Sequence, residues 1–125
     1  MGHVILIFLG AGAGGVLRYW LSNSLYAVMG RQFPYGTLFV NVSGCLLMGF
    51  LFVLIMDRLD GVGPQLRSLL LIGFLGGYTT FSSFSLETVS LIENGQWLGA
   101  SLNVLLSNLL CIAAAWIGII GARLL

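Results

Sequence analysis

Charge is what this sequence lacks most. Of its 125 residues only 7% are Asp, Glu, Lys or Arg, whereas 58% are hydrophobic. A soluble globular domain carries roughly 25% charged residues, which keep its surface in contact with water. The shortage of charge therefore excludes a soluble domain and predicts a protein embedded in a lipid bilayer.

The side chains needed for enzymatic chemistry are also scarce. Asp57 and Asp60 share one polar link, and the only histidine, His3, stands alone near the N-terminus. No paired carboxylates, no nucleophile beside a histidine and no metal-binding cluster can be assembled from these residues. Cys45 and Cys111 lie within apolar segments and are interpreted as small buried residues. We expect a protein that is not an enzyme and has no nucleic-acid partner.

What the sequence has instead is long segments without charge. These segments are 1–17, 32–56, 68–86 and 94–122. A helix needs about 20 mostly apolar residues to cross a bilayer, so there is room for four spans. We expect them over approximately 3–29, 35–56, 65–93 and 97–123. The links are short, so neighbouring helices should pack antiparallel. The predicted fold is an all-α membrane protein, with residues 1–125 forming a single four-helix transmembrane domain.

The arginines give little indication of orientation. With four spans, Arg58, Arg67 and Arg123 share one side of the membrane, and Arg31 lies on the other, joined by Arg18 if it leans that way. Basic residues in short loops normally set orientation, and this bias is weak. Such a chain could insert both ways. We therefore expect an antiparallel, dual-topology homodimer with a twofold axis in the membrane plane.

A glycine-rich motif, GAGAGG at 10–15, matches the dinucleotide-binding pattern G-x-G-x-x-G. That pattern also requires an acidic residue about 20 positions later, whereas the first acid here is Asp57. We interpret the glycines as a smooth helix face. Gly10 and Gly14 form a GxxxG pair that would let a neighbouring helix approach closely.

The segment GGYTTFSSFSLE, residues 76–87, places glycines and hydroxyls inside the third span. Gly76 and Gly77 weaken a helix by roughly 1 kcal/mol each relative to alanine, and Thr79 and Thr80 are β-branched. We therefore expect the third helix to be broken near its middle, over Gly76–Thr79. Broken backbone is tolerated in a bilayer only where protein or an ion satisfies its polar groups.

Two aromatic rings follow the predicted break. Phe81 and Phe84 stand three residues apart, so they share a helix face, and Ser82 supplies a hydroxyl beside them. An aromatic ring has a positive edge, which an anion can contact without a formal cation. Ring edges and hydroxyl donors suit a small hydrated anion that must bind and still leave.

Polar residues also form stripes in two other spans. Thr37 and Asn41 are four residues apart in the second span, and Asn103, Ser107 and Cys111 repeat every four residues in the fourth. Such residues often only join helices, at about 1 kcal/mol or less each. Each stripe alone favours that structural role. The two stripes together with the hydroxyl-rich segment favour a lined path.

Arg18 lies beyond the middle of the first span. A charge at this depth must reach the interface, pair with an acid or serve a pathway. A structural anchor and an electropositive vestibule for an anion both remain open.

Three motifs together are similar to one known family. They are a glycine-rich first span ending in Arg18 and an aromatic residue, GTLFVNVSG in the second span, and GFLGGYTTFSSFSLE in the third. Over its whole length the chain resembles the Fluc (CrcB-type) fluoride channels of bacteria. The resemblance implies a dual-topology homodimer of four-helix subunits in the cytoplasmic (inner) membrane, with two anion pores and a central sodium ion. It also implies passive export of fluoride, which accumulates because neutral hydrofluoric acid enters cells and ionises.

The resemblance further implies roles for single residues. Phe81 and Phe84 are similar to the pore phenylalanines, and Asn41 to the pore asparagine. The backbone carbonyls of Gly76 and Thr79 would hold the sodium ion. The predicted anion pathway comprises Phe81, Phe84, Asn41, Ser82, Thr37, Ser107, Asn103 and Arg18, with Cys111 as a further candidate on the polar track.

A small multidrug-type, proton-coupled exporter is the alternative, because it too is a dual-topology dimer of four short spans. It would need a lone carboxylate in the first span, where this chain has Arg18 and no acid. A membrane assembly factor that transports nothing is a third class. A transport assay on liposomes that contain the protein would separate these three classes. It would show fluoride efflux, drug uptake or neither.

Overall fold

The computed structural model describes residues 1–125 and is entirely helical. Four helical segments are long and apolar enough to cross a membrane. They are α1 (Gly2–Met29), α2 (Tyr35–Arg58), a composite third span (Gly63–Glu93) and α6 (Trp97–Arg123). The third span consists of α3 (Gly63–Leu66), the π-helical η1 (Arg67–Leu75), α4 (Gly76–Tyr78) and α5 (Phe81–Glu93). The predicted fold class, four spanning helices with the third one broken, is confirmed.

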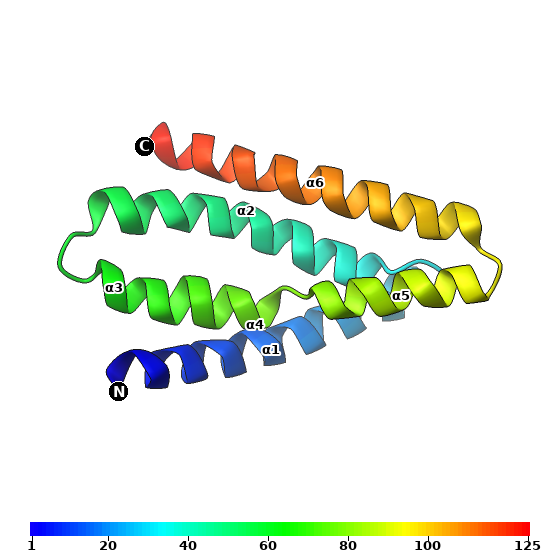
Figure 1. The fold of residues 1–125 in the computed structure, drawn as a ribbon, viewed down its shortest axis with the longest axis horizontal. Helices are drawn as coiled ribbons and strands as arrows, with labels where there is room; N and C mark the ends of the chain where they lie inside the picture. Colours follow the sequence, from blue (N-terminus) through cyan, green and yellow to red (C-terminus); the bar gives the residue numbers. More distant parts are fainter.

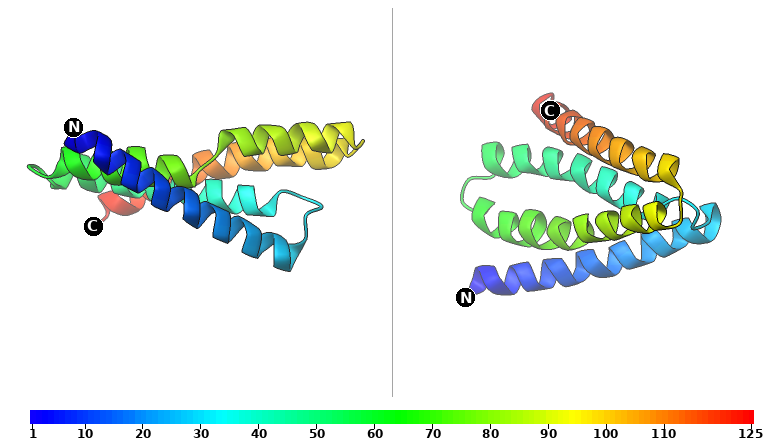
Figure 2. Two further views of the ribbon diagram at one scale, coloured as in Figure 1. Left: turned by 90° about the horizontal axis from the view of Figure 1, so that it is seen from below. Right: turned by 45° about the vertical axis from the view of Figure 1, so that its right-hand side comes forward.

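The spans alternate in direction, so both chain ends lie at one end of the molecule together with the link between α2 and α3 (Figure 1). The other two links lie at the opposite end. As a consequence α2 and α6 run in the same direction, and they pack side by side, while α1 packs along η1 and α4. Toward the end that carries links 30–34 and 94–96, α1 and α5 diverge (Figure 2, left).

Each link between spans contains one glycine with a positive φ angle: 85° at Gly30, 75° at Gly61 and 73° at Gly95. These are the only residues with positive φ in the chain, and a side chain at such positions is disfavoured. Pro34 precedes α2, and Pro64 lies in the first turn of α3, where its missing N–H costs nothing. The chain therefore turns where its glycines and prolines permit it.

Small residues bring α1 into backbone contact with the third span. A Cβ on Gly10 would overlap the carbonyl oxygen of Leu69, and one on Gly14 would overlap that of Phe74. Gly77 lies equally close to the backbone of α1. The smooth glycine face expected from the sequence is present. It allows the close approach on which helix association in membranes depends.

Close backbone contacts at glycines also join α2 to α6. A Cβ on Gly49 would overlap the carbonyl oxygen of Ala115, and one on Gly118 would overlap that of Leu46. The two parallel helices are thereby held at a fixed separation along their second halves.

A small apolar core lies between these helix pairs. It consists of Val40, Ile55, Leu71, Leu75 and Tyr78. Only 25 of the 125 residues are buried, and many large apolar side chains are exposed. Lipid can cover such a surface, and so can a second subunit.

The break in the third span is shorter than predicted and lies nearer to the C-terminal half. Gly76 is still helical, with φ −63° and ψ −37°. The backbone leaves the helix only at Thr79 (φ −81°, ψ 159°) and Thr80 (φ −152°, ψ 121°). The expectation of an unwound Gly76–Thr79 segment was therefore wrong at its first residues. Gly77 is part of a helix that packs against α1, and this packing outweighs the low helix propensity of glycine.

Candidate functional site

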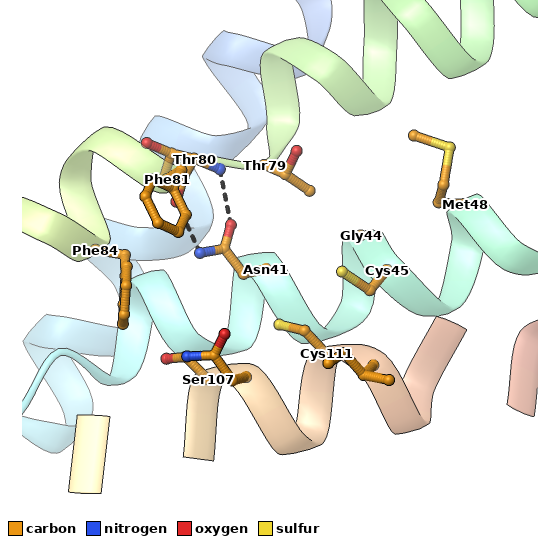
Figure 3. Close-up of a pocket in the computed structure, with 12 residues that line it drawn as sticks. Asn41, Gly44, Cys45, Met48, Thr79, Thr80, Phe81, Phe84, Ser107 and Cys111 are labelled. Carbon is orange, nitrogen blue, oxygen red and sulfur yellow. Dashed lines mark hydrogen bonds between the residues drawn. The ribbon is translucent and has the colours of Figure 1, made fainter. Parts of the chain in front are cut away.

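The break exposes backbone groups that other helices satisfy. Asn41 of α2 donates from Nδ2 to the carbonyl oxygen of Thr80 at 2.8 Å, and its Oδ1 accepts from the Thr80 N–H at 2.7 Å (Figure 3). Arg18 of α1 donates from Nη1 to the carbonyl oxygen of Thr79 at 3.3 Å. Unsatisfied groups here would cost several kcal/mol each in hydrocarbon, so these contacts make the break possible.

Asn41 therefore has a structural task that the sequence analysis did not predict. A primary amide has two N–H donors and one carbonyl acceptor. Thr80 takes one donor and the acceptor, which leaves one N–H of Asn41 for another partner. The amide still lines a cavity, described below, so its remaining donor can serve a ligand there.

Thr80 also begins α5. Its hydroxyl accepts from the N–H of Ser83 at 3.1 Å, which is the contact of an N-cap residue. The Ser82 hydroxyl lies 3.3 Å from the same oxygen, so this predicted pathway residue belongs to the cap. The N-terminus of a helix carries a partial positive charge and free N–H groups, which favour anions. The break thus turns the positive end of α5 toward the middle of the molecule.

A cavity of about 280 Å³ lies beside the break, between α2, α5 and α6 (Figure 3). Twelve residues line it: Asn41, Gly44, Cys45, Met48, Thr79, Thr80, Phe81, Phe84, Ser107, Asn108, Cys111 and Ile112. No acidic or basic side chain is among them. The cavity thus combines apolar walls with neutral donors.

The two predicted phenylalanines stand at this cavity. The ring centroids of Phe81 and Phe84 are 5.3 Å apart, with an angle of 47° between the ring planes. Phe84 is buried, whereas Phe81 is 76% exposed. The pair is thus anchored by one ring and presents the other outward, where lipid or a second subunit must cover it.

A chain of hydrogen bonds leads away from the cavity along α6. Ser107 donates to Oδ1 of Asn103 at 3.3 Å, and Asn103 donates from Nδ2 to the hydroxyl of Thr88 at 2.8 Å. Thr88 in turn donates to the Phe84 carbonyl oxygen at 2.7 Å. Asn103 is only 1% exposed. The fourth-span stripe therefore joins α6 to α5 and reaches the cavity at Ser107.

Thr37 lies apart from the cavity. Its hydroxyl donates to Oε1 of Glu87 at 2.7 Å, and the Tyr26 hydroxyl lies 3.4 Å from Oε2 of the same carboxylate. Arg31 stacks over the Tyr26 ring, 5.0 Å from its centroid. Of the residues predicted for the pathway, Thr37, Asn103, Ser82 and Arg18 do not line the cavity, whereas Asn41, Phe81, Phe84 and Ser107 do.

Three residues that form hydrogen bonds in this region were not predicted from the sequence. Thr80 is the centre of the break, Thr88 continues the hydrogen-bond chain, and Glu87 accepts from Thr37. The spacing of Thr80 and Ser83 fits an N-cap followed three residues later by its N–H donor, which could have marked the start of α5. Nothing in the spacing of Thr88 and Asn103 indicates that they meet.

Most of the chain matches one family. A family model described as "CrcB-like protein, Camphor Resistance (CrcB)" matches residues 5–119. The chain belongs to the CrcB family. Named relatives agree with this assignment and cover the same four spans.

A protein of Coxiella burnetii (strain Dugway 5J108-111), named "Fluoride-specific ion channel FluC", is 64% identical over 121 residues, which are 97% of this chain and 98% of that protein. One of Magnetococcus marinus (strain ATCC BAA-1437 / JCM 17883 / MC-1), with the same name, is 50% identical over 123 residues, 98% of this chain and 99% of the relative. A Methylococcus capsulatus (strain ATCC 33009 / NCIMB 11132 / Bath) protein of that name is 56% identical over 117 residues, 94% of this chain but 51% of its own length.

Proposed function

We propose that this CrcB-family protein is a channel that conducts fluoride passively across the cytoplasmic membrane and so lowers cytoplasmic fluoride. The relatives named above are fluoride-specific ion channels by name. The observation that carries the proposal for this chain is the cavity beside the break, where two phenylalanine rings, the start of α5 and neutral donors meet without any charged lining residue.

The chemistry of this cavity suits a small anion. The edge of an aromatic ring is positive, so tilted rings at Phe81 and Phe84 offer an anion contacts that hold it without a formal charge. The free N–H of Asn41 adds a hydrogen-bond donor, and the Ser107 hydroxyl would add another if an anion replaced Asn103 as its acceptor. A fixed cation in the lining would bind fluoride too firmly, whereas several weak contacts allow it to enter and leave.

The rest of the proposed pathway follows the polar groups that reach this cavity. Ser107 and Asn103 extend it along α6, and Ser82 adds a hydroxyl at the start of α5. Thr37 is proposed to stand near one mouth, where its hydroxyl already meets the Glu87 carboxylate. Arg18 would raise the local potential from behind the break, because it contacts the Thr79 carbonyl and does not line the cavity.

We propose that two copies assemble antiparallel. Phe81 is 76% exposed although it belongs to the proposed pathway, so a pore built by one subunit alone would leave this ring in lipid. The weak arginine bias fits insertion in both orientations. A second copy would cover Phe81 and part of the exposed apolar surface.

A sodium ion at the dimer centre is part of the same proposal. In a continuous helix the Thr80 N–H would donate to the Gly76 carbonyl, but here it donates to Asn41. The Thr79 carbonyl is outside any helix and accepts only the long contact from Arg18. Both carbonyls therefore fit the donor set of a hard monovalent cation. They would hold it from both subunits, and its role would be structural.

Fluoride efflux from liposomes tests the function. Purified protein should release trapped fluoride, measured with a fluoride electrode, when a potassium ionophore balances the charge. Protein-free liposomes and chloride-loaded liposomes are the controls. Proton-coupled uptake of a cationic drug without fluoride efflux would favour the exporter instead, for which α1 lacks the necessary carboxylate.

A further inference from the structure

The two cysteines of this chain meet across a helix interface. Cys45 lies on α2 and Cys111 on α6, and both line the cavity beside the break. The close-up shows their side chains next to each other, at the same level of the cavity (Figure 3). They are unpaired, and the sequence contains no other cysteine. Both were expected to be small buried residues, but they are half-buried, and their spacing along the sequence does not indicate that they lie together.

The packing of α2 and α6 fixes the position of this pair. The two helices run in parallel. One helical turn after each cysteine lie Gly49 of α2 and Ala115 of α6, where the two backbones touch. One turn back leads to Asn41 and Ser107, which line the cavity. The thiols thus occupy the level between a rigid backbone contact and the proposed anion pathway. Two sulfur atoms brought to one level by packed helices can act together as a bidentate ligand.

The surroundings of the thiols select the kind of ion that can bind. Thiolate sulfur favours soft metal ions. Zinc prefers four ligands, and no cluster of three or more His, Cys, Asp or Glu exists in this protein. A two-coordinate ion needs only the two sulfurs. A divalent ion with two thiolates is also neutral, whereas a monovalent ion would leave a net negative charge, which is costly inside a membrane.

We propose that Cys45 and Cys111 form a binding site for one soft, two-coordinate divalent metal ion, of which Hg²⁺ is the type. On binding, each S–H bond breaks and its proton goes to water, and two metal–sulfur bonds form without any change in oxidation state. If the cavity conducts fluoride as proposed above, a metal ion at this level obstructs it. The site would then make the channel sensitive to thiophilic metals.

Counting free thiols tests the site independently of transport. Purified protein receives one equivalent of Hg²⁺ per chain and then a maleimide, and the label is counted by mass spectrometry. We expect the wild type to lose both reactive thiols to one metal ion. In C45S and in C111S, we expect Hg²⁺ to block the one thiol that remains. One equivalent of Zn²⁺ should protect neither.

A wild-type protein that keeps one free thiol under these conditions would overturn the site, because the metal would then bind a single sulfur. A mixture of C45S and C111S chains serves as the matched control for bridging between subunits. This mixture receives one equivalent of Hg²⁺ for each pair of chains. If both thiols are then blocked, the metal bridges two chains, and the pair of cysteines within one chain is not the site.

Flux measurements then test the consequence. Fluoride efflux from wild-type liposomes should fall to the protein-free level after Hg²⁺ and return with excess dithiothreitol. Each variant is compared with its own metal-free rate, and C45S/C111S should keep that rate. Loss of both thiols with unchanged wild-type efflux would overturn obstruction of the pathway. Absence of fluoride efflux before any metal is added would instead overturn the proposed function, and the thiol count would still decide the metal site.

Discussion

The hydrogen-bonded pair of Asn41 and Thr80 yields the sharpest prediction of this structure. Asn41→Ala removes two hydrogen bonds, of 2.7 and 2.8 Å, at the only point where the third span leaves the helix. Each is worth about 0.5–1.5 kcal/mol, and leaving the Thr80 N–H without a partner adds about 1–3 kcal/mol. Local opening of the break should therefore become about 2–6 kcal/mol easier.

The Thr80 amide reports this change directly. Its exchange with deuterium occurs through local opening, so the rate follows the opening free energy. At about 1.4 kcal/mol per factor of ten, the predicted change corresponds to roughly 30- to 20,000-fold faster exchange. Amide exchange measured by NMR on protein in bilayer discs would detect it. Ser43→Ala is the matched control, because it removes an α2 side chain that contacts the Tyr78 hydroxyl at 2.8 Å. Equal Thr80 exchange in Asn41→Ala and wild type would refute the reasoning.

Asn41→Asp separates the structural role of this residue from a role in the pathway. The carboxylate can still accept from the Thr80 N–H, which should keep that amide better protected than in Asn41→Ala. It also places a negative charge in the cavity, where an anion would be repelled. We therefore expect lower fluoride flux in Asn41→Asp than in Asn41→Ala, despite the better protection. Flux that simply follows Thr80 protection in both variants would remove Asn41 from the pathway.

Three further predictions concern the rings, the assembly and the sodium ion. Phe81→Ile and Phe84→Ile should reduce fluoride flux while leaving a folded dimer, because isoleucine fills space without a positive ring edge; wild-type flux in both would mean that the rings only pack. A cysteine replacing Leu125 in the C45S/C111S background should react with a membrane-impermeant reagent from both sides of the membrane, and labelling from one side only would disprove dual topology. Removal of sodium should lower the melting temperature and the flux, and Thr79→Ser should keep wild-type sodium dependence, since the ligand is a backbone carbonyl; indifference of both properties to sodium would end that proposal.

Much of the fold could be predicted because the bilayer restricts the possibilities. Within hydrocarbon every backbone group needs a partner, so charge-free segments of this length must form helices. The four spans and the broken third helix follow from that rule together with the glycines and threonines of residues 76–80. The position of the break could not be predicted as well. The low helix propensity of Gly77 favours a break at this residue. Its backbone packs against α1, which is distant in the sequence, and this contact keeps Gly77 helical.

Half of the residues predicted for the pathway line the cavity, but their hydrogen bonds could not be predicted. Phe81, Phe84, Asn41 and Ser107 were expected near one another, and the cavity brings them together. Their individual partners depend on how α2, α5 and α6 are rotated, which no spacing along the sequence specifies. Thr37 illustrates the limit: it lies one helical turn from Asn41, yet its hydroxyl bonds to Glu87 outside the cavity.

The break and the cavity are connected through the same atoms, and this connection limits how the site can hold an anion. Asn41 has two N–H donors, of which the Thr80 carbonyl uses one. An anion in the cavity can therefore receive only one hydrogen bond from this amide without opening the break. Its remaining contacts must come from the ring edges and the start of α5, because the Ser107 hydroxyl already donates to Asn103. Weak, divided coordination of this kind follows from the need to satisfy the broken backbone first, and it is the kind of coordination that a conducting site requires.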